Sequence, residues 1–137
     1  MEIVKAGNSD ISAILSLSSQ MGYSLSGQTG YENLQRILQH PDHEIYLAWA
    51  DGELAGYIHV CKMLRVTSKP FLEIIGLVVD NKQRRQGIGK LLVEKCRTQL
   101  KVPTVRVRTN AKRQDAIAFY ESLGFERAKD QMVMVLE

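Results

Sequence analysis

The sequence predicts an α/β fold of the α+β type, with a mixed, mostly antiparallel sheet flanked by helices, in a single domain over residues 1–137. Three observations predict it. The length of 137 residues fits one ordinary domain, and 45% hydrophobic with 24% charged residues is typical of a globular core. Segments with strand and helix periodicity follow in the order β-α-α-β-β-β-α-β-α-β-β. The Asp51-Gly52 dipeptide between two strand-like segments indicates a tight antiparallel hairpin.

The predicted strands are runs or alternations of apolar residues. They cover residues 3–6, 44–50, 53–63, 71–79, 104–109, 124–128 and 131–136. The fourth is nearly continuous in apolar residues once Pro70 has interrupted the chain, so we expect it at the centre of the sheet. In the fifth, Val105 and Val107 alternate with Arg106 and Arg108, which indicates one buried and one solvated face.

The predicted helices have apolar residues at helical spacing. They cover residues 11–22, 31–39, 87–100 and 113–123, with a polar, glycine-containing loop at 24–30. Asn8, Ser9 or Asp10 can cap the first helix, because a short side-chain oxygen accepts hydrogen bonds from its free N–H groups. The His40-Pro41 pair stops the second helix. Gly124 ends the fourth as a C-cap.

Charge and composition exclude several classes of protein. The net charge of +3 is only mildly basic, and 7% aromatic residues without a Lys/Arg-aromatic interleave argue against nucleic-acid binding. The longest uncharged apolar run, residues 74–79, is far shorter than the ~20 residues of a membrane span. The N-terminus has no signal-peptide pattern, so we expect a cytoplasmic protein. Cys61 and Cys96 form no disulfide framework, and Cys96 falls on the apolar face of a predicted helix.

The most informative stretch is a basic, glycine-bearing turn between the fourth strand and the third helix. It covers residues 80–90, with the sequence DNKQRRQGIGK. Free N–H groups and the helix dipole attract anions to a helix N-terminus, and glycines let the backbone approach them closely. The pattern is neither a Walker A loop nor a dinucleotide-binding fingerprint. It therefore predicts a pyrophosphate site of another kind.

With this turn the chain resembles the GNAT superfamily of acyl-CoA-dependent N-acetyltransferases. Residues 84–89, RRQGIG, match the [QR]-x-x-G-x-[GA] motif of that family. In register with it, residues 50–57 are similar to the family's second hairpin, residues 73–79 to its fourth strand and residues 116–125 to its last helix and following strand. The resemblance covers about residues 2–136. It implies a sheet of about seven strands, flanked by about four helices and splayed between strands four and five.

The resemblance implies acetyl-CoA as co-substrate and no metal. The pyrophosphate would be held by the turn residues Arg84, Arg85, Gln86, Gly87, Ile88, Gly89 and Lys90. Pantetheine would lie in the splay along the backbone of Leu77, Val78 and Val79. Many family members carry an asparagine seven residues before a tyrosine of the last helix. This chain has Arg113 there and its nearest asparagine at Asn110, and we expect one of these to reach CoA.

Two further residues are implied to be catalytic. Tyr120 matches the tyrosine thought to protonate the leaving thiolate, although it also fits a core position of its helix. Glu73, an ionisable residue in an apolar strand, is a candidate base unless it lies at an exposed edge. His59, which shares a strand face with Tyr57 and Cys61, or a water molecule, are the alternatives. Cys61 is not a convincing nucleophile, because the sequence identifies no His/Asn pair for it.

We therefore expect direct attack of a primary amine on acetyl-CoA in a ternary complex. The acceptor is expected to be a small molecule rather than a protein, with no nucleic-acid or membrane partner and with a homodimer as one option. The alternative is a non-catalytic acyl-CoA-binding or sensing module on the same scaffold. His40, His43 and His59 are dispersed along the chain without a Cys/His cluster, which argues against a zinc site.

Overall fold

The computed structural model describes residues 1–23 and 27–137. The chain forms two compact units, Met1–Val107 and Arg108–Glu137, which are described one at a time. Part of the expected loop, residues 24–26, lies outside the described residues, and the rest of that loop is already helical from Gly27. The single domain over residues 1–137 stays a prediction.

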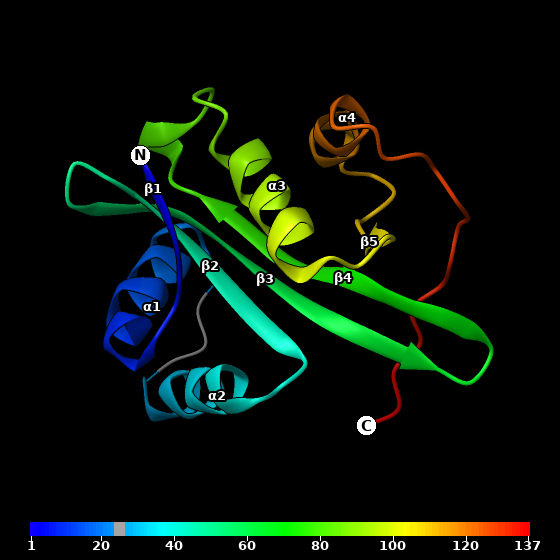
Figure 1. Cartoon of the computed structure of the whole chain (residues 1–137), viewed down its shortest axis with the longest axis horizontal. Coiled ribbons are helices and arrows are strands. Elements are labelled where there is room, and N and C mark those ends of the chain that lie inside the picture. Colours follow the sequence, from blue (N-terminus) through cyan, green and yellow to red (C-terminus); the bar gives the residue numbers. More distant parts are fainter. Residues whose placement is uncertain (24–26) are drawn as a thin grey trace. The chain divides into compact units, whose positions relative to one another are not determined.

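The first unit contains a five-stranded sheet with the strand order β1-β2-β3-β4-β5 (Figure 1). The strands are β1 (Glu2–Lys5), β2 (His43–Ala50), β3 (Glu53–Arg65), β4 (Ser68–Val79) and β5 (Val105–Val107). The first four pair antiparallel, whereas β4 and β5 are parallel. A parallel pair needs a crossover connection, and helix α3 (Ile88–Leu100) supplies it. The prediction of a mixed, mostly antiparallel sheet is thus confirmed.

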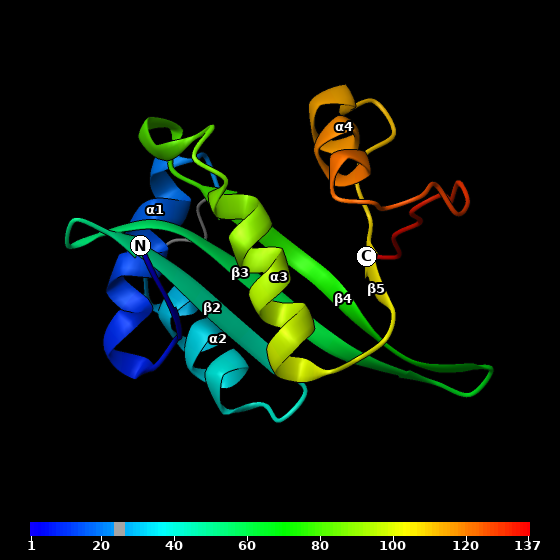
Figure 2. The same ribbon diagram turned by 45° about the horizontal axis from the view of Figure 1, so that its top comes forward.

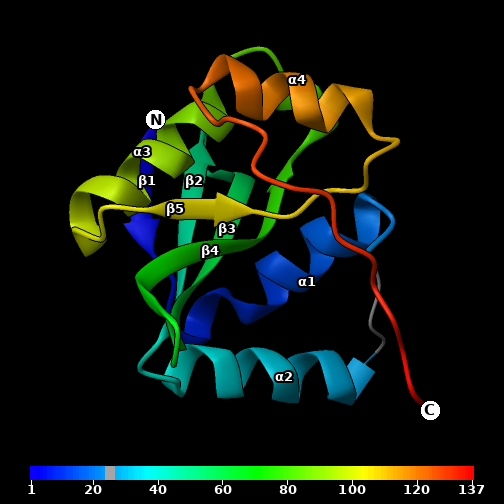
Figure 3. The ribbon, with the colours of Figure 1, turned by 90° about the vertical axis from the view of Figure 1, so that its right-hand side faces the viewer.

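Helices α1 (Ile11–Gln20) and α2 (Gly27–Gln39) cover one face of this sheet, and α3 covers the other (Figure 2 and Figure 3). Two consecutive residues of β3 show the division. The Tyr57 hydroxyl lies 2.7 Å from Ser18 Oγ on α1, whereas Gly56 faces Ile88 of α3. Consecutive strand residues point to opposite faces. We call the two sides the α1/α2 face and the α3 face.

Apolar side chains fill both sides of the sheet. On the α1/α2 face the buried cluster comprises Ala6, Ile11, Ile14, Leu34, Ile45 and Leu47. On the α3 face, Ile58 and Leu72 of the strands and Leu92 and Cys96 of α3 are at most 1% exposed. Each large side chain buried in this way contributes about 1.5–3 kcal/mol. Burial also raises the pKa of the Cys96 thiol to about 12, so Cys96 is an inert core residue.

The sequence predicted that Pro70 interrupts the chain before the fourth strand. In the structure Pro70 lies inside β4 instead. The reason is the position of its neighbour strand, because β5 pairs with β4 only from Leu72 onward. At Pro70 one edge of β4 therefore has no strand beside it in the first unit. The missing N–H group costs no ladder hydrogen bond on that edge.

The second unit contains helix α4 (Gln114–Ser122), so the described residues form four α-helices, in agreement with the prediction of about four. Gly124, at φ +97°, ends the helix, and the Phe125 N–H donates a 3.1 Å hydrogen bond back to the Tyr120 carbonyl. Residues 124–128 and 131–136 form no strand within the described part of the chain, so the described sheet has five strands rather than about seven. Alternating residues indicate which face of a segment is apolar, but a strand also needs a partner.

Candidate active site

The basic turn joins the end of β4 to the N-terminus of α3. It begins at Asp80, whose carboxylate accepts a 3.0 Å hydrogen bond from the Lys82 N–H and caps a short 3-10 turn. Arg85 and Gly87 follow at φ +68° and +75°, in the left-handed region. These two positive φ angles turn the chain sharply into α3, and glycine adopts such a conformation without a side-chain clash.

Unpaired N–H groups stand where the turn enters the helix. The hydrogen bond at the start of α3 runs from the Leu91 N–H to the Gly87 carbonyl, at 3.0 Å. The N–H groups of residues 88–90 therefore have no acceptor inside the helix. The exposed side chains of Arg84 and Arg85 precede them. Convergent N–H groups with positive charge beside them are suited to a phosphate or pyrophosphate.

Two contacts hold this turn against β3. The Asp80 N–H donates a 2.8 Å hydrogen bond to the Ala55 carbonyl. At Gly56, an added Cβ would lie 2.9 Å from the Val78 carbonyl oxygen and 3.3 Å from Ile88 Cγ2. A side chain there would push α3 and β4 away, so glycine is required for this close packing. The hairpin at residues 50–57 thus helps to hold the turn in place.

Strand β4 has a free edge, within the first unit, just before the turn. β5 pairs with it only over residues 72–74. A register shift between His59 and Val60 of β3 then makes Ile75 the extra residue of a β-bulge in β4. The predicted pantetheine positions, residues 77–79, pair with β3 and have no β5 partner. A splay between β4 and β5 beyond this point stays a prediction.

Glu73 is buried and ion-paired rather than exposed at an edge. Arg106, which opposes it on β5, places Nε 2.8 Å from Glu73 Oε1. The same guanidinium lies over the Phe71 ring, 4.4 Å from its centroid. Glu73 also opposes Cys61 of β3, so its side chain belongs to the α1/α2 face. The sequence showed the basic side of the fifth strand, but no signal in it named Glu73 as the partner.

The three histidines, which are dispersed in the sequence, gather at the start of β2. Nδ1 of His43 lies 2.8 Å from Nε2 of His59, and Nε2 of His43 lies 3.5 Å from Cys61 Sγ. The His40 ring meets His43 edge-on, with centroids 4.8 Å apart. We call His40, His43, His59 and Cys61 the histidine cluster. The cluster corrects the expectation that no histidine partner is identifiable for Cys61. His43 lies beside Cys61 because the register of β2 and β3 places the two residues opposite each other.

Burial sets the protonation of this cluster. Burial and then the neighbouring His43 lower the pKa of His59 to about 4. The pKa of His43 is also lowered, by burial and then by His40. Burial raises the pKa of the Cys61 thiol, and nearby Asp42 and Glu73 raise it further. Both imidazoles are therefore neutral at neutral pH, and Cys61 is a protonated thiol, which argues against a nucleophilic role.

Tyr120 lies on α4 in the second unit. Its ring packs edge-on against Phe119 and Phe125, with centroids 5.0 and 5.4 Å apart. Burial raises the pKa of the Tyr120 hydroxyl, and Arg113 offsets this only in part. The hydroxyl is therefore protonated at neutral pH and can act as a proton donor.

Asn110 and Arg113 precede α4. Asn110 Oδ1 accepts a 2.9 Å hydrogen bond from the Lys112 N–H, and the Arg113 N–H donates to the Asn110 carbonyl, also at 2.9 Å. Arg113 Nη2 lies 3.4 Å from Asp115. The Asn110 side chain thus shapes the turn that starts the helix. Contacts of Asn110, Arg113 and Tyr120 with CoA stay predictions.

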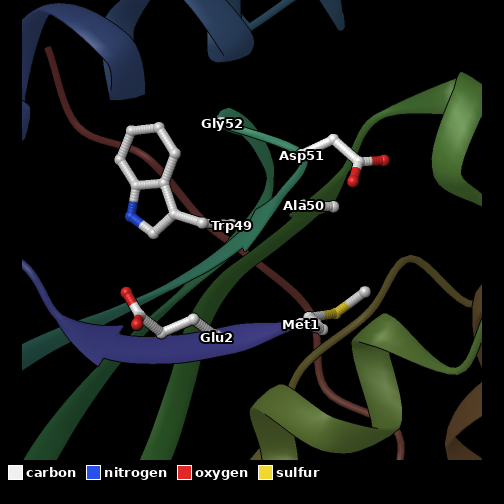
Figure 4. Close-up of a pocket in the computed structure, with 6 residues that line it drawn as sticks. All are labelled: Met1, Glu2, Trp49, Ala50, Asp51 and Gly52. Atoms are coloured by element: carbon white, nitrogen blue, oxygen red, sulfur yellow. The ribbon is translucent and has the colours of Figure 1, made fainter.

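A shallow hollow of about 720 Å³ lies at the start of β1 and the β2–β3 turn (Figure 4). It is lined by Met1, Glu2, Trp49, Ala50, Asp51 and Gly52. It shares no residue with the basic turn, Glu73 or the histidine cluster, so we assign it no chemistry. Among residues 1–23 and 27–137, no group of three or more His, Cys, Asp or Glu side chains could hold a metal ion. Over the same residues no helix is long and apolar enough to cross a membrane.

Known proteins share this fold. AAC(6')-Iy, solved in complex with the bisubstrate analog CoA-S-monomethyl-acetylneamine, has a TM-score of 0.88 at 18% identity, covering 99% of this chain and 97% of that one. The aminoglycoside antibiotic 6'-N-acetyltransferase AAC(6')-IG from Acinetobacter haemolyticus has a TM-score of 0.82 at 18% identity, covering 100% and 99%. The aminoglycoside acetyltransferase meta-AAC0020 from an uncultured soil metagenomic sample, in complex with sisomicin, has a TM-score of 0.81 at 21% identity, covering 99% and 96%. No curated protein sequence matches the chain.

The fold is shared with these acetyltransferases. The model of the acetyltransferase (GNAT) family matches residues 11–125, which is most of the chain. The chain belongs to the GNAT acetyltransferase family, whose acyl donor is acetyl-CoA.

Proposed function

We propose that this protein transfers the acetyl group of acetyl-CoA to a primary amine, by direct attack of the amine on the thioester in a ternary complex. The basic turn carries the proposal. It combines unpaired helix N–H groups with two arginines, directly after the stretch of β4 that β5 does not reach. Anion binding at a helix N-terminus and strand pairing along a free edge are the two interactions that a pyrophosphate with an extended amide chain requires.

Each part of acetyl-CoA then has a partner in this chain. The backbone of residues 84–90 would bind the pyrophosphate. Pantetheine would run along the free edge at residues 77–79. A backbone N–H of that edge would stabilise the oxyanion that forms when the amine attacks the thioester carbonyl. Tyr120, whose raised pKa keeps its proton at neutral pH, would protonate the departing thiolate.

Glu73 stands as the carboxylate candidate for the proton acceptor. Its side chain is buried on the α1/α2 face, which suits a group that acts away from bulk water. Its ion pair with Arg106 is an obstacle, because a proton on the carboxylate would weaken that pair. Glu73 is equally suited to orient the groups around it.

A small-molecule amine is the proposed acceptor. Its support is the shared fold with aminoglycoside acetyltransferases, of which meta-AAC0020 is solved with sisomicin. In this chain the α1/α2 face is open above Gly76, where an added Cβ would meet no atom within 4 Å. No atom is therefore packed directly over this position, beside the β-bulge.

Calorimetric titration with acetyl-CoA, CoA and ATP tests the cofactor site. We expect the wild-type protein to bind both CoA species and not ATP. An Arg84→Ala, Gly87→Ala, Gly89→Ala triple variant should lose that binding. A second variant, Arg84→Ala with Arg85→Gly, removes both charges while glycine accepts the left-handed backbone, so it is expected to fold and to bind CoA at least tenfold more weakly, at about 1.4 kcal/mol per factor of ten.

Arg36→Ala is the matched control for these variants. It removes an exposed arginine from α2, on the other side of the sheet from the turn, and should leave CoA affinity unchanged. Wild-type protein that binds no CoA species would contradict the proposal. Equal weakening in Arg36→Ala would show that only overall charge had been measured.

The alternative, a non-catalytic acyl-CoA-binding module, draws support from one observation. The Glu73 carboxylate on β4 forms an ion pair with Arg106, and the described part of that strand offers no second carboxylate as a base. CoA-thiol release with a panel of amines separates the two functions. Saturable acetyl-CoA binding without thiol release for any amine would favour the binding module.

A further inference from the structure

The histidine cluster borders open space on the α1/α2 face of β4. His59 opposes Gly76 across the β3–β4 pair, so both positions belong to the same face. An added Cβ at Gly76 would meet no atom within 4 Å, and its backbone has no positive φ. Gly76 directly follows the β-bulge, where β4 has lost its β5 partner. A ligand held at that edge would thus have His59 one strand away.

The hydrogen bonds of the cluster run in one direction. The Cys61 thiol donates to the Lys62 carbonyl at 3.7 Å, so its sulfur is left to accept from Nε2–H of His43 at 3.5 Å. Nδ1 of His43 then has the lone pair and accepts from Nε2–H of His59 at 2.8 Å. In a neutral imidazole the other nitrogen is the acceptor. Nδ1 of His59, which has no hydrogen-bond partner among the described residues, is therefore free to take a proton.

We propose that His59 and His43 form a relay that accepts the proton of the acceptor amine. This inference rests on the proposed acetyl transfer and identifies its proton acceptor. His59 takes the proton at Nδ1, directly or through one water, as general bases do. His43 acts through His59 and is a positioning residue. Unlike Glu73, His59 loses no ion pair when it is protonated.

The groups around the relay set its direction. Those that face the two histidines are His40, Asp42, Tyr57, Cys61 and Glu73. His40 and the burial of both rings lower their pKa values, so each ring is neutral at neutral pH and has one nitrogen with a lone pair. Asp42 favours a positive charge on His43. Asp42 therefore favours a proton on His43, away from the reacting amine, against the opposing effects of burial and His40.

The proton balance of the step is complete. The bound ammonium gives one proton to Nδ1 of His59, and the Nε2 proton of His59 passes to Nδ1 of His43. The neutral amine then attacks the thioester carbonyl, so that a C–N bond forms and the C–S bond breaks. The nitrogen loses a second proton as the amide forms, and the CoA thiolate takes up one proton as it leaves, so these two protons balance. The products are the acetamide, CoA thiol and a protonated histidine pair, which returns its proton to solvent.

The test follows CoA-thiol release against pH with two amines of different basicity. An alkylamine must lose a proton before it can attack at neutral pH, whereas trifluoroethylamine is already largely neutral there. For the alkylamine, His59→Gln and His43→Gln should each lower kcat/KM about 100-fold at neutral pH. They should also move the acidic limb of its pH profile to higher pH, because only amine that is already neutral then reacts. Both variants should leave the rate with trifluoroethylamine nearly unchanged. Lys62→Gln, which changes an exposed side chain of β3 outside the histidine cluster, is the matched control and should resemble wild type.

A second variant guards against misfolding of the histidine variants. Gly76→Ala leaves the cluster intact and places a methyl group in the open space, so it should raise the KM for both amines and keep the wild-type pH profile. Equal losses for both amines in His59→Gln, or a wild-type pH profile in both histidine variants, would overturn the relay. If wild-type protein binds acetyl-CoA but releases no thiol with any amine at any pH, acetyl transfer itself is overturned, and the relay with it.

Discussion

The two faces of the sheet in the first unit differ sharply, although the same strands supply both. The α3 face is largely apolar, with side chains such as Ile58 and Leu92 fully buried, and its ion pair, Lys5 with Glu44 at 3.1 Å, lies at the β1 side of the sheet. The α1/α2 face is apolar only beside its helices. Farther along, one register row crosses four strands with the polar residues His43, Cys61, Glu73 and Arg106. The larger apolar core on the α3 face supplies stability, which allows the α1/α2 face to hold a row of polar and ionisable groups at some cost in stability.

The largest loss of stability is expected on the α3 face. Leu92→Ala removes a side chain with 0% exposure and should lower the free energy of unfolding by about 3 kcal/mol, because a cavity remains. Leu91→Ala, at a neighbouring residue with 45% exposure, should change it by less than about 0.5 kcal/mol. Urea denaturation followed by circular dichroism measures both. Similar losses in the two variants would contradict the assignment of the core to this face.

On the α1/α2 face the ion pair of Glu73 and Arg106 should give the next largest effect. The two side chains are 8% and 23% exposed, so their charges are poorly screened. A double-mutant cycle of Glu73→Gln and Arg106→Met should yield a coupling free energy of about 2 kcal/mol in the same denaturation assay. Additive single losses would mean that the pair does not hold β4 and β5 together.

Acid should destabilise the protein through His59. The pKa of His59 is about 4 in the folded chain, against 6.5 for an ordinary histidine, so between these pH values the unfolded chain binds more protons. The stability contribution is complete above pH 6.5 and is lost as the pH falls towards 4. Partial exposure of the ring limits the loss to about 1–2 kcal/mol. Unfolding free energies at neutral and acid pH should fall more in wild type than in His59→Gln, and parallel curves would refute the assignment.

An exposed ion pair in the second unit should give the smallest effect. Arg127 Nε and Glu121 Oε2 are 3.4 Å apart, at 72% and 47% exposure. Glu121→Gln should change the free energy of unfolding by less than about 0.5 kcal/mol, because water screens the pair. The comparison with Glu73 and Arg106 isolates burial as the variable. A loss in Glu121→Gln as large as that from the buried pair would remove burial as the explanation.

Local patterns in the sequence were sufficient for most of the fold. The hairpin at Asp51-Gly52 was predictable because both residues need a positive φ, which they have at 52° and 78°. Long apolar segments such as residues 71–79 were predictable because their pattern of side chains is also local in the sequence. The strands expected at 124–128 and 131–136 were not found, because alternation within a segment carries no information about which strand would pair with it.

The parts of the candidate site also differed in how far the sequence could predict them. The basic turn is continuous in sequence, so its glycines and arginines could be recognised together. The histidine cluster joins the start of β2 to the middle of β3, and the ion pair joins Glu73 to Arg106 across more than thirty residues. Both depend on strand register, which one sequence without its structure leaves undetermined.

The left-handed backbone at Arg85 also bears on attempts to make this protein more robust. A side chain other than glycine at φ +68° costs about 1 kcal/mol relative to an unstrained conformation. Glycine would relieve that strain, so Arg85 would be an obvious choice in any search for stabilising substitutions. The guanidinium that glycine lacks stands beside the unpaired N–H groups of α3. Thermostability and affinity for an anionic ligand are therefore opposed at this one position, and selection for heat resistance alone would be expected to erode the site.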